Sequence, residues 1–353
     1  MKGLRKLVSL IAVTAMLTTG FVGCSKNDAK GKEQSKNGKE IKVGVALYKF
    51  DDTFISTVRQ AIEKEAQTLG KEKDVKITVN PVDGQGQQAT QNDQIDTFIN
   101  QKYDVLAVNM VDRTAASVII DKAKKEDIPV VFFNREPVKE DMNKWDKLYY
   151  VGAKAEESGT MQGELIGEYW KKHKEADRNK DGKLQYVMLE GEPGHQDAIL
   201  RTQFSVKALD EAGIKSEKLA SDTANWQRAQ GQEKMAAWLS SYGDKIEAVF
   251  ANNDDMALGA IEALKAAGYF NGKKSIPVVG VDATAPALDS LKEDKLYGTI
   301  LNDANNQGKY ILDMAYDLAK KEDVAKDIEG ITDGKYKWVP YQPITKENVS
   351  KVK

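Results

Sequence analysis

The sequence has 353 residues, with 52 Lys and Arg against 54 Asp and Glu, and its formal net charge is -2. This balance lacks the basic excess that is typical of nucleic-acid-binding proteins, so we expect no nucleic-acid partner. The length predicts two domains or one large one. The single cysteine excludes an internal disulfide bond.

The amino terminus has the composition of a secretory signal peptide. Three basic residues precede an apolar run from Leu7 to Val22, which is short for a membrane span. The run ends in Phe21-Val22-Gly23-Cys24, which resembles a bacterial lipobox with phenylalanine in place of the usual leucine. In a lipobox the cysteine becomes the lipidated first residue, and here that residue would be Cys24.

The segment after Cys24 is polar and dense in Lys, Asn, Gly and Glu. Such a segment cannot bury enough apolar surface to offset the entropy lost on ordering. We therefore expect a signal peptide over residues 1–23 and a lipidated cysteine with a flexible tether over residues 24–40. The protein would be extracytoplasmic and anchored by lipid to the bacterial cell membrane.

The first half of the remaining chain alternates strand-like and helical segments. A strand over Ile41–Leu47 precedes a helix with one apolar face from Ile55 to Leu69, which Gly70 would stop. Next come a strand over 75–79, a Gln/Asn-rich loop and a helix through Ile95 and Ile99. Strands over 105–108 and 128–133 flank a helix over 115–124. This alternation predicts a parallel sheet with helices on both faces.

The second half repeats the order. Strands over 184–189, 248–251 and 276–281 alternate with helices over 198–212 and 256–267. Residues 104–109 resemble 247–252, and residues 128–134 resemble 276–282. The second pair of segments ends in the polar residues Asn134 and Asp282. Two similar lobes with polar strand ends would face each other across a ligand cleft.

Oxygen-bearing side chains occupy alternate positions before the 184–189 strand. They are Asp177, Asn179, Asp181 and Gln185. With Gly182 at the sixth position, they form the front half of an EF-hand calcium loop. An EF-hand needs a bidentate glutamate at the twelfth position, where this chain has Met188, and a strand follows where a helix should. From spacing alone, a metal site and an ordinary polar turn both stay open.

A polar cluster follows the same strand. His195, Asp197 and Arg201 come after a Gly-Glu-Pro-Gly turn at the start of a helix. Most Asp–Arg pairs at this i, i+4 spacing are weak exposed ion pairs, but the position after a strand end favours a ligand site. Trp226 lies in a polar loop with no obvious core to fill.

Several of these residues also have ordinary structural interpretations. Asp52 could be the N-cap of the helix that begins near Phe54, and Asn134 and Asp282 could cap the helices that follow them. From the residues alone, capping by Asp52 is as good an interpretation as ligand binding.

Motifs along the chain resemble the bacterial galactose/glucose-binding proteins, the receptors of methyl-galactoside-type sugar importers. The matching segments run from about Ile41 to the end and include YKFDDTF, PVVFFNREP, GEPGHQDAILR, DTANW, ANNDDMALG, GVDA and LNDANNQ. The resemblance implies an α/β fold of two Rossmann-like lobes with parallel sheets, joined by a three-crossover hinge. This is the type I periplasmic binding protein fold. The N-terminal lobe would comprise residues 41–152 and 302–338, and the C-terminal lobe residues 153–301 and 339–353.

The same resemblance implies a sugar site and a calcium site. The sugar would contact Asp52, Phe54, Asn134, His195, Asp197, Arg201, Trp226, Asn253, Asp282 and Asn302. Sugar hydroxyls donate and accept hydrogen bonds, which suits carboxylates, amides and cations, and the flat C–H faces of a pyranose suit aromatic rings. A structural Ca²⁺ would be held by Asp177, Asn179, Asp181, Gln185, the carbonyl of Lys183 and the distant Glu247.

These implications describe a monomeric, non-catalytic receptor. It would deliver D-galactose or D-glucose to an ABC importer permease, and a chemotaxis receptor is a further candidate partner. A glycoside-processing enzyme is an alternative, but Asp197 beside Arg201 is expected to stay ionised, whereas a general acid needs a raised pKa. A sugar repressor would need a DNA-binding domain where the signal peptide and tether are expected. A receptor for ribose or a signalling furanose stays open.

Overall fold

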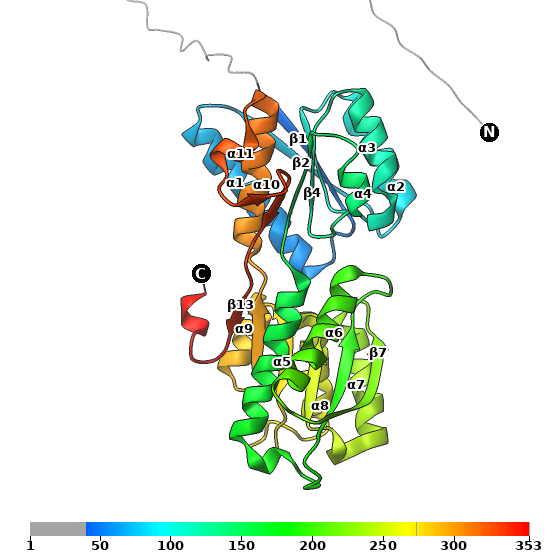
Figure 1. Ribbon diagram of the computed structural model, residues 1–353, viewed down its shortest axis with the longest axis vertical. Helices are drawn as coiled ribbons and strands as arrows, with labels where there is room; N and C mark the ends of the chain where they lie inside the picture. Colours follow the sequence, from blue (N-terminus) through cyan, green and yellow to red (C-terminus); the bar gives the residue numbers. More distant parts are fainter. Residues whose placement is uncertain (1–39, 273, 353) are drawn as a thin grey trace, which may run out of the picture. The chain divides into compact units, whose positions relative to one another are not determined.

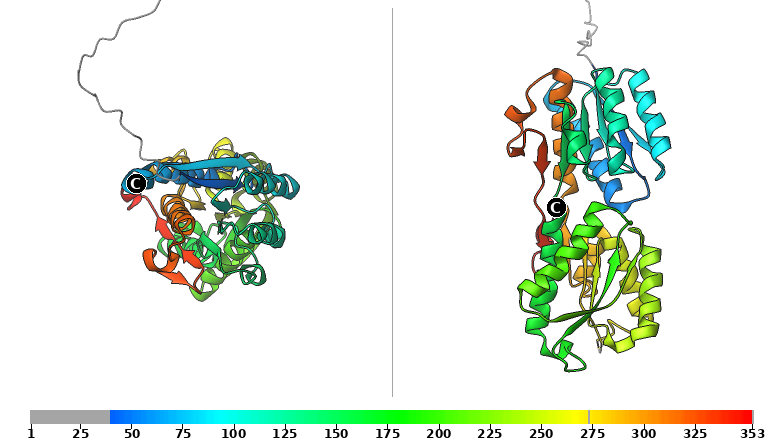
Figure 2. Two further views of the ribbon diagram at one scale, coloured as in Figure 1. Left: turned by 90° about the horizontal axis from the view of Figure 1, so that it is seen from above. Right: turned by 45° about the vertical axis from the view of Figure 1, so that its right-hand side comes forward.

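The structure is a computed structural model, and it describes residues 40–272 and 274–352 (Figures 1 and 2). The predicted signal peptide and the predicted lipidation site at Cys24 lie outside this part of the chain. Nearly all of the expected tether also lies outside it. Two sheets organise the described residues, with strand orders β11-β12-β5-β4-β3-β1-β2 and β13-β10-β9-β8-β6-β7. None of the helices in this part is long and apolar enough to cross a membrane.

The first lobe is built mainly from the amino-terminal half. Its elements there are β1 (Ile41–Leu47), α1 (Thr53–Glu72), β2 (Ile77–Asp83), α2 (Gln88–Asn100), β3 (Val105–Val108), α3 (Ala116–Lys125), β4 (Val130–Phe133), α4 (Lys139–Met142) and β5 (Leu148–Gly152). The chain returns to this lobe later with α10 (Ala304–Lys320), α11 (Val324–Asp327), β11 (Ile331–Thr332) and β12 (Tyr336–Trp338).

The second lobe holds the middle of the chain. Its elements are α5 (Ala155–Lys172), β6 (Leu184–Glu190), α6 (Gln196–Glu211), β7 (Ser216–Thr223), α7 (Arg228–Tyr242), β8 (Ala248–Ala251), α8 (Asp254–Ala266), β9 (Val278–Asp282), α9 (Ala285–Lys292), β10 (Gly298–Leu301) and, near the carboxyl end, β13 (Gln342–Ile344). In Figure 2, helices flank this sheet on both sides.

The chain passes between the two sheets three times. The passages lie between Gly152 and Ala155, between Leu301 and Ala304, and between Trp338 and Gln342. Five strands of each sheet follow the same order, since β2-β1-β3-β4-β5 corresponds to β7-β6-β8-β9-β10. The two lobes are therefore two copies of one doubly wound arrangement, in which ligands bind at the carboxyl ends of the strands.

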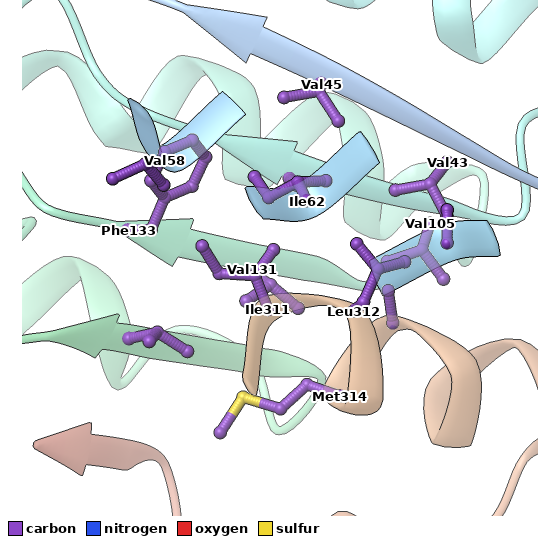
Figure 3. Close-up of a cluster of buried hydrophobic side chains, with 14 of the residues drawn as sticks. Val43, Val45, Val58, Ile62, Val105, Val131, Phe133, Ile311, Leu312 and Met314 are labelled. Carbon is purple, nitrogen blue, oxygen red and sulfur yellow. The ribbon is translucent and has the colours of Figure 1, made fainter. Parts of the chain in front are cut away.

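Apolar periodicity explains how α1 joins the first core. Its buried side chains, which include Ile55, Val58 and Ile62, recur on one face, as the sequence predicts. They pack with β1, β3, β4 and α10 in one cluster (Figure 3). Gly308 of α10 allows the two helices to approach, because a Cβ there would lie 2.5 Å from the Cβ of Ala61.

The structure corrects several sequence predictions. Helix α1 continues past Gly70, and β2 begins at Ile77 and continues through Pro81 to Asp83. Proline is tolerated there because β2 is an edge strand that pairs only with β1. The expected Gln/Asn-rich loop is mostly the start of α2, which begins at Gln88.

The sheets are also not wholly parallel. Strand β13 pairs antiparallel with β10, and β11 pairs antiparallel with β12. Both exceptions lie at sheet edges, where the chain arrives after its last two passages between the lobes.

Candidate functional site: a closed polar cavity between the lobes

A small cavity lies where the strand ends of the two lobes meet. All ten residues of the predicted sugar site line it, from both lobes. The complete lining is Tyr48, Asp52, Phe54, Ile55, Asn134, Arg135, His195, Asp197, Arg201, Trp226, Asn253, Asp282 and Asn302.

Asp52 combines the two roles that the sequence left open. Its Oδ1 accepts the N–H of Ile55 at 2.8 Å, which caps α1, and its Oδ2 accepts the hydroxyl of Tyr48 at 2.5 Å. Burial raises the pKa of Asp52 and also that of Tyr48, so the phenol stays protonated and donates. One carboxylate thus begins the helix and forms part of the cavity wall.

Asn134 does not cap a helix. It follows β4 in a left-handed conformation with φ of 60°, which a short polar side chain tolerates. The Nδ2 of Asn109 donates to Asn134 Oδ1 at 3.1 Å, and the Tyr150 hydroxyl donates to the Asn134 carbonyl at 2.8 Å. The amide is therefore fixed before any ligand arrives.

Arg201 is the most fully bonded cation in the cavity wall. It is 4% exposed, and its guanidinium donates to the hydroxyl of Ser158, the carbonyl of Asn252 and the hydroxyl of Tyr341. A fourth bond, of 3.3 Å, reaches Asp197 Oδ2. These bonds hold the guanidinium in one orientation beside the cavity.

Two opposing effects act on the pKa of Asp197. Burial raises the pKa of Asp197, and the attraction of Arg201 opposes this rise without cancelling it. Sequence reasoning considered only the neighbouring arginine and could not foresee the burial of the carboxyl group.

His195 begins α6 as its N-cap. Its Nδ1 accepts the N–H of Asp197 at 3.1 Å, which leaves the proton of a neutral ring on Nε2. Burial and three nearby arginines lower the pKa of His195 well below its usual value. The ring is therefore a neutral hydrogen-bond donor at neutral pH.

Trp226 supplies an aromatic wall that its neighbours hold in place. The Nδ2 of Asn253 donates to the Trp226 carbonyl at 3.2 Å, while Asn253 Oδ1 caps α8 through Met256 N–H. The indole meets the His195 ring edge-on, with 5.0 Å between ring centroids. Phe54, from the first lobe, is the second aromatic side chain on the cavity that the sequence identified.

Asp282 occupies a strained turn at the end of β9. Its φ is 118°, so it does not have the geometry of a helix cap, and its Oδ1 accepts Asn302 Nδ2 at 3.3 Å. Behind it lies the fully buried Asp254, which accepts the Thr299 hydroxyl at 2.6 Å and the Thr284 N–H at 2.8 Å. Burial raises the pKa of Asp254 to about 7 and that of Asp282 well above its usual value.

Two polar residues of the cavity wall, Tyr48 and Arg135, are not among the predicted site residues. Both lie inside segments that carried the resemblance, YKFDDTF and PVVFFNREP. The guanidinium of Arg135 stacks on the Tyr48 ring, with 3.7 Å from its central carbon to the ring centroid. Nothing in the local sequence indicates this contact, because the residues that follow β1 and β4 approach each other only in the folded sheet, across β3.

The predicted calcium loop forms a compact hydrogen-bonded network at the other end of β6. Asp181 Oδ2 accepts the side-chain amides of Asn179 at 3.0 Å and Gln185 at 2.7 Å. Glu247 joins the loop from afar and accepts the N–H groups of Arg178 and Gln185. Burial raises the pKa of Glu247, and the negative charges of the nearby Asp177 and Asp181 raise it further.

The donor set fits a calcium ion only after small rearrangements. Among the described residues, no three His, Cys, Asp or Glu side chains converge as a ready metal site. Asn179 and Gln185 present their nitrogens to Asp181, and a half-turn of either amide would present its oxygen instead. The residues present are hard oxygen donors of the type that Ca²⁺ prefers.

Comparisons with known proteins agree with this geometry. The periplasmic binding protein domain family matches residues 43–323. The D-galactose/methyl-galactoside binding periplasmic protein MglB of Haemophilus influenzae is 40% identical over 337 residues, which cover 95% of this chain and 98% of that protein. The ribose import binding protein RbsB of Bacillus subtilis is 28% identical and covers 92% of this chain and 97% of that protein.

Solved structures show the same fold. An ABC transporter solute binding protein from Bacillus halodurans with bound myo-inositol is 30% identical. It superposes with a TM-score of 0.72 and covers 88% of this chain and 96% of that chain. A Mycobacterium smegmatis protein in complex with β-D-fucofuranose, 25% identical, has a TM-score of 0.73 and covers 88% and 93%.

Proposed function

Because the chain belongs to the periplasmic binding protein domain family, we propose that it captures D-galactose or D-glucose in the cavity between its lobes and delivers the sugar to an ABC importer. Members of this family are extracytoplasmic, substrate-binding receptors of ABC transporters and not enzymes. A glycoside-processing activity is therefore excluded by the family and not by the pKa of Asp197.

The observation that supports a hexose most strongly is the composition of the closed cavity. It brings three carboxylates, three side-chain amides, two guanidinium groups and a neutral imidazole around one small volume, with Phe54 and Trp226 as aromatic walls. Each sugar hydroxyl can both donate and accept, so it matches neighbouring carboxylates and cationic donors. The C–H faces of a pyranose match the rings.

Both hexoses are expected to bind. D-glucose and D-galactose differ in whether the hydroxyl on the fourth carbon is equatorial or axial. The carboxylate of Asp52 could accept from either position. The similarity to the H. influenzae galactose/methyl-galactoside protein supports the same sugar class.

Three further features belong to the same proposal. A structural Ca²⁺ held by Asp177, Asn179, Asp181, Gln185, Glu247 and the Lys183 carbonyl would stabilise the second lobe by neutralising three close carboxylates. Lipidation at Cys24 would anchor the receptor to the cell membrane. The monomer would present its closed form to the permease, and a chemotaxis receptor is a second candidate reader of that form.

The rival proposal is a receptor for another polyol of similar size. Similarities to a ribose-binding protein and to structures with bound myo-inositol and a furanose favour testing these ligands directly. Calorimetric titration of residues 41–353 with D-galactose, D-glucose, D-ribose and myo-inositol separates the two. We expect tight binding of both hexoses. Tight binding of ribose or myo-inositol without hexose binding would rule out the hexose assignment.

A further inference from the structure

Arg135 is a buried cation that touches both lobes at the edge of the cavity. It follows β4 in the first lobe, is 7% exposed and lines the cavity. Its Nη1 donates to the Val111 carbonyl at 2.9 Å. Its Nη2 donates to Glu192 Oε2 in the second lobe at 2.8 Å. An arginine so enclosed has an orientation set by several partners at once.

One side of this arginine leads to a ligand-binding carboxylate. The guanidinium lies 3.7 Å from the centroid of the Tyr48 ring, close enough for a strong cation–π contact. The Tyr48 hydroxyl donates to Asp52 at 2.5 Å. Asp52 therefore fixes the ring on which the guanidinium rests.

The other side leads to the opposite lobe. Glu192 follows β6, and its carbonyl accepts the N–H of His195, so the turn that carries Glu192 also carries a cavity residue. The side chain of Glu192 is 31% exposed, whereas that of Arg135 is 8% exposed. When the lobes separate, Glu192 can be hydrated, but Arg135 loses its charged partner.

We propose that Arg135 is a positioning residue that couples occupation of Asp52 to closure of the lobes through the chain Asp52, Tyr48, Arg135 and Glu192. This inference rests on the proposed function, since it assumes that a sugar occupies the cavity. A sugar hydroxyl on Asp52 holds the carboxylate against Tyr48. Tyr48 then holds the guanidinium flat and aimed at Glu192. An ion pair with one buried partner is most favourable when its geometry is fixed in this way.

Another contact between the lobes provides a matched control. The Thr53 hydroxyl donates to Asp255 Oδ2 of the second lobe. Asp255 is also paired with Arg228 at 2.8 Å, and no described hydrogen bond joins this pair to Arg135 or Tyr48. Thr53→Val removes a contact between the lobes and leaves every hydrogen bond of the proposed chain in place.

The test is a double-mutant cycle on D-galactose binding by the full-length protein. Tyr48→Phe keeps the ring under Arg135 but removes the bond to Asp52, and Glu192→Gln removes the charge at the far end. Each single variant should release sugar roughly five to ten times faster, with an association rate within about twofold of wild type. Arg135→Lys should behave like Glu192→Gln, because lysine keeps the charge but loses the planar stack.

The decisive quantity is the coupling between the two ends. If the chain operates, the Tyr48→Phe/Glu192→Gln double variant should release sugar no more than about twofold faster than the worse single variant. Tyr48→Phe with Thr53→Val should show the product of the two single effects. A product of single effects in the Tyr48/Glu192 cycle would overturn the inference while leaving the sugar assignment intact.

The proposed function fails in a different way. A wild-type protein that binds another monosaccharide in place of the hexoses overturns the hexose assignment, and the same cycle is then measured with that ligand. A wild-type protein that binds no monosaccharide overturns both the function and the coupling.

Discussion

Gly191 makes room for Trp226: a Cβ on this glycine would lie 2.1 Å from the indole ring. Gly191 follows β6 and Trp226 follows the neighbouring strand β7. The indole can occupy its place in the cavity wall because Gly191 has no side chain. Shape in this part of the cavity is set by the pair and not by the tryptophan alone.

The first prediction follows from this pair. Trp226→Ala should weaken hexose binding by about 1–3 kcal/mol, because the sugar loses both stacking and apolar burial. Gly191→Ala should weaken binding in the same direction by displacing the ring, although Trp226 is still present. Titration calorimetry measures both, and Trp226→Phe, which keeps an aromatic face, should lose less. Wild-type affinity in Gly191→Ala would show that the ring position does not matter.

The second prediction concerns Asp254, the buried carboxyl group behind Asp282. Burial raises the pKa of Asp254 to about 7 in the folded protein, above the value of about 3.9 for an unperturbed Asp. Between these two values the folded state binds the extra proton, so the contribution of Asp254 to stability falls as pH rises from about 4 to 7. The stability advantage of wild type over Asp254→Asn should therefore shrink over this range.

Urea unfolding of both proteins at pH 4.5, 6 and 8 measures the effect. We expect the advantage to shrink by at least about 1.4 kcal/mol, the free energy of one pKa unit. Parallel pH profiles for the two proteins would mean that Asp254 does not titrate in this range.

The third prediction tests the structural calcium ion. An ion that binds only the folded state adds about 4 kcal/mol at a thousand times its dissociation constant. A chelator should thus lower the melting temperature, and calcium should restore it better than magnesium, which demands a tighter octahedron. Glu247→Ala should be less stable than wild type, and the chelator should have no further effect on it.

Hexose affinity should change far less than stability in these experiments, since β6 separates the loop from His195 at the cavity. Identical melting curves for wild type with and without chelator would leave the loop as an ordinary polar turn.

The fourth prediction concerns the anchor. Cys24→Ala should release the protein from the membrane fraction, because the thiol that would carry the lipid is gone, while hexose binding by the released protein stays unchanged. Fractionation of cells and immunoblotting measure the distribution. A variant that sediments with membranes as wild type does would contradict lipidation at Cys24.

The sequence predicts the fold well wherever the residues of a single helix or strand are enough to identify it. The apolar face of α1 and the buried β8 strand follow from periodicity and composition, and the repeated segments indicate two lobes. The errors arise where context decides. The predicted strand ends at residue 79, whereas β2 continues through Pro81, which an edge strand tolerates. The Gln/Asn-rich start of α2 lacks the apolar residues that indicate a helix, so a loop is predicted there.

The candidate site shows the same division. The ten sugar-site residues stand in motifs of a known family, so their identity could be carried over one by one. Arg135 and Tyr48 gain meaning only from their stacking, which joins two strands distant in sequence. The raised pKa of Asp197 likewise reflects burial by both lobes, which no local spacing reveals.

The central claim is that one hexose binds in the cavity between the lobes, and calorimetry of one variant from each lobe tests it most directly. Asp52→Asn keeps the oxygen that caps α1, and Asp282→Asn changes the opposite wall; each replaces a carboxyl acceptor of the cavity with an amide. We predict one D-galactose per wild-type chain and a loss of roughly five- to hundredfold in affinity for each variant, since a buried donor left without its acceptor costs about 1–3 kcal/mol. Unchanged affinity in both variants, or no heat of binding from either hexose with wild type, would contradict the account.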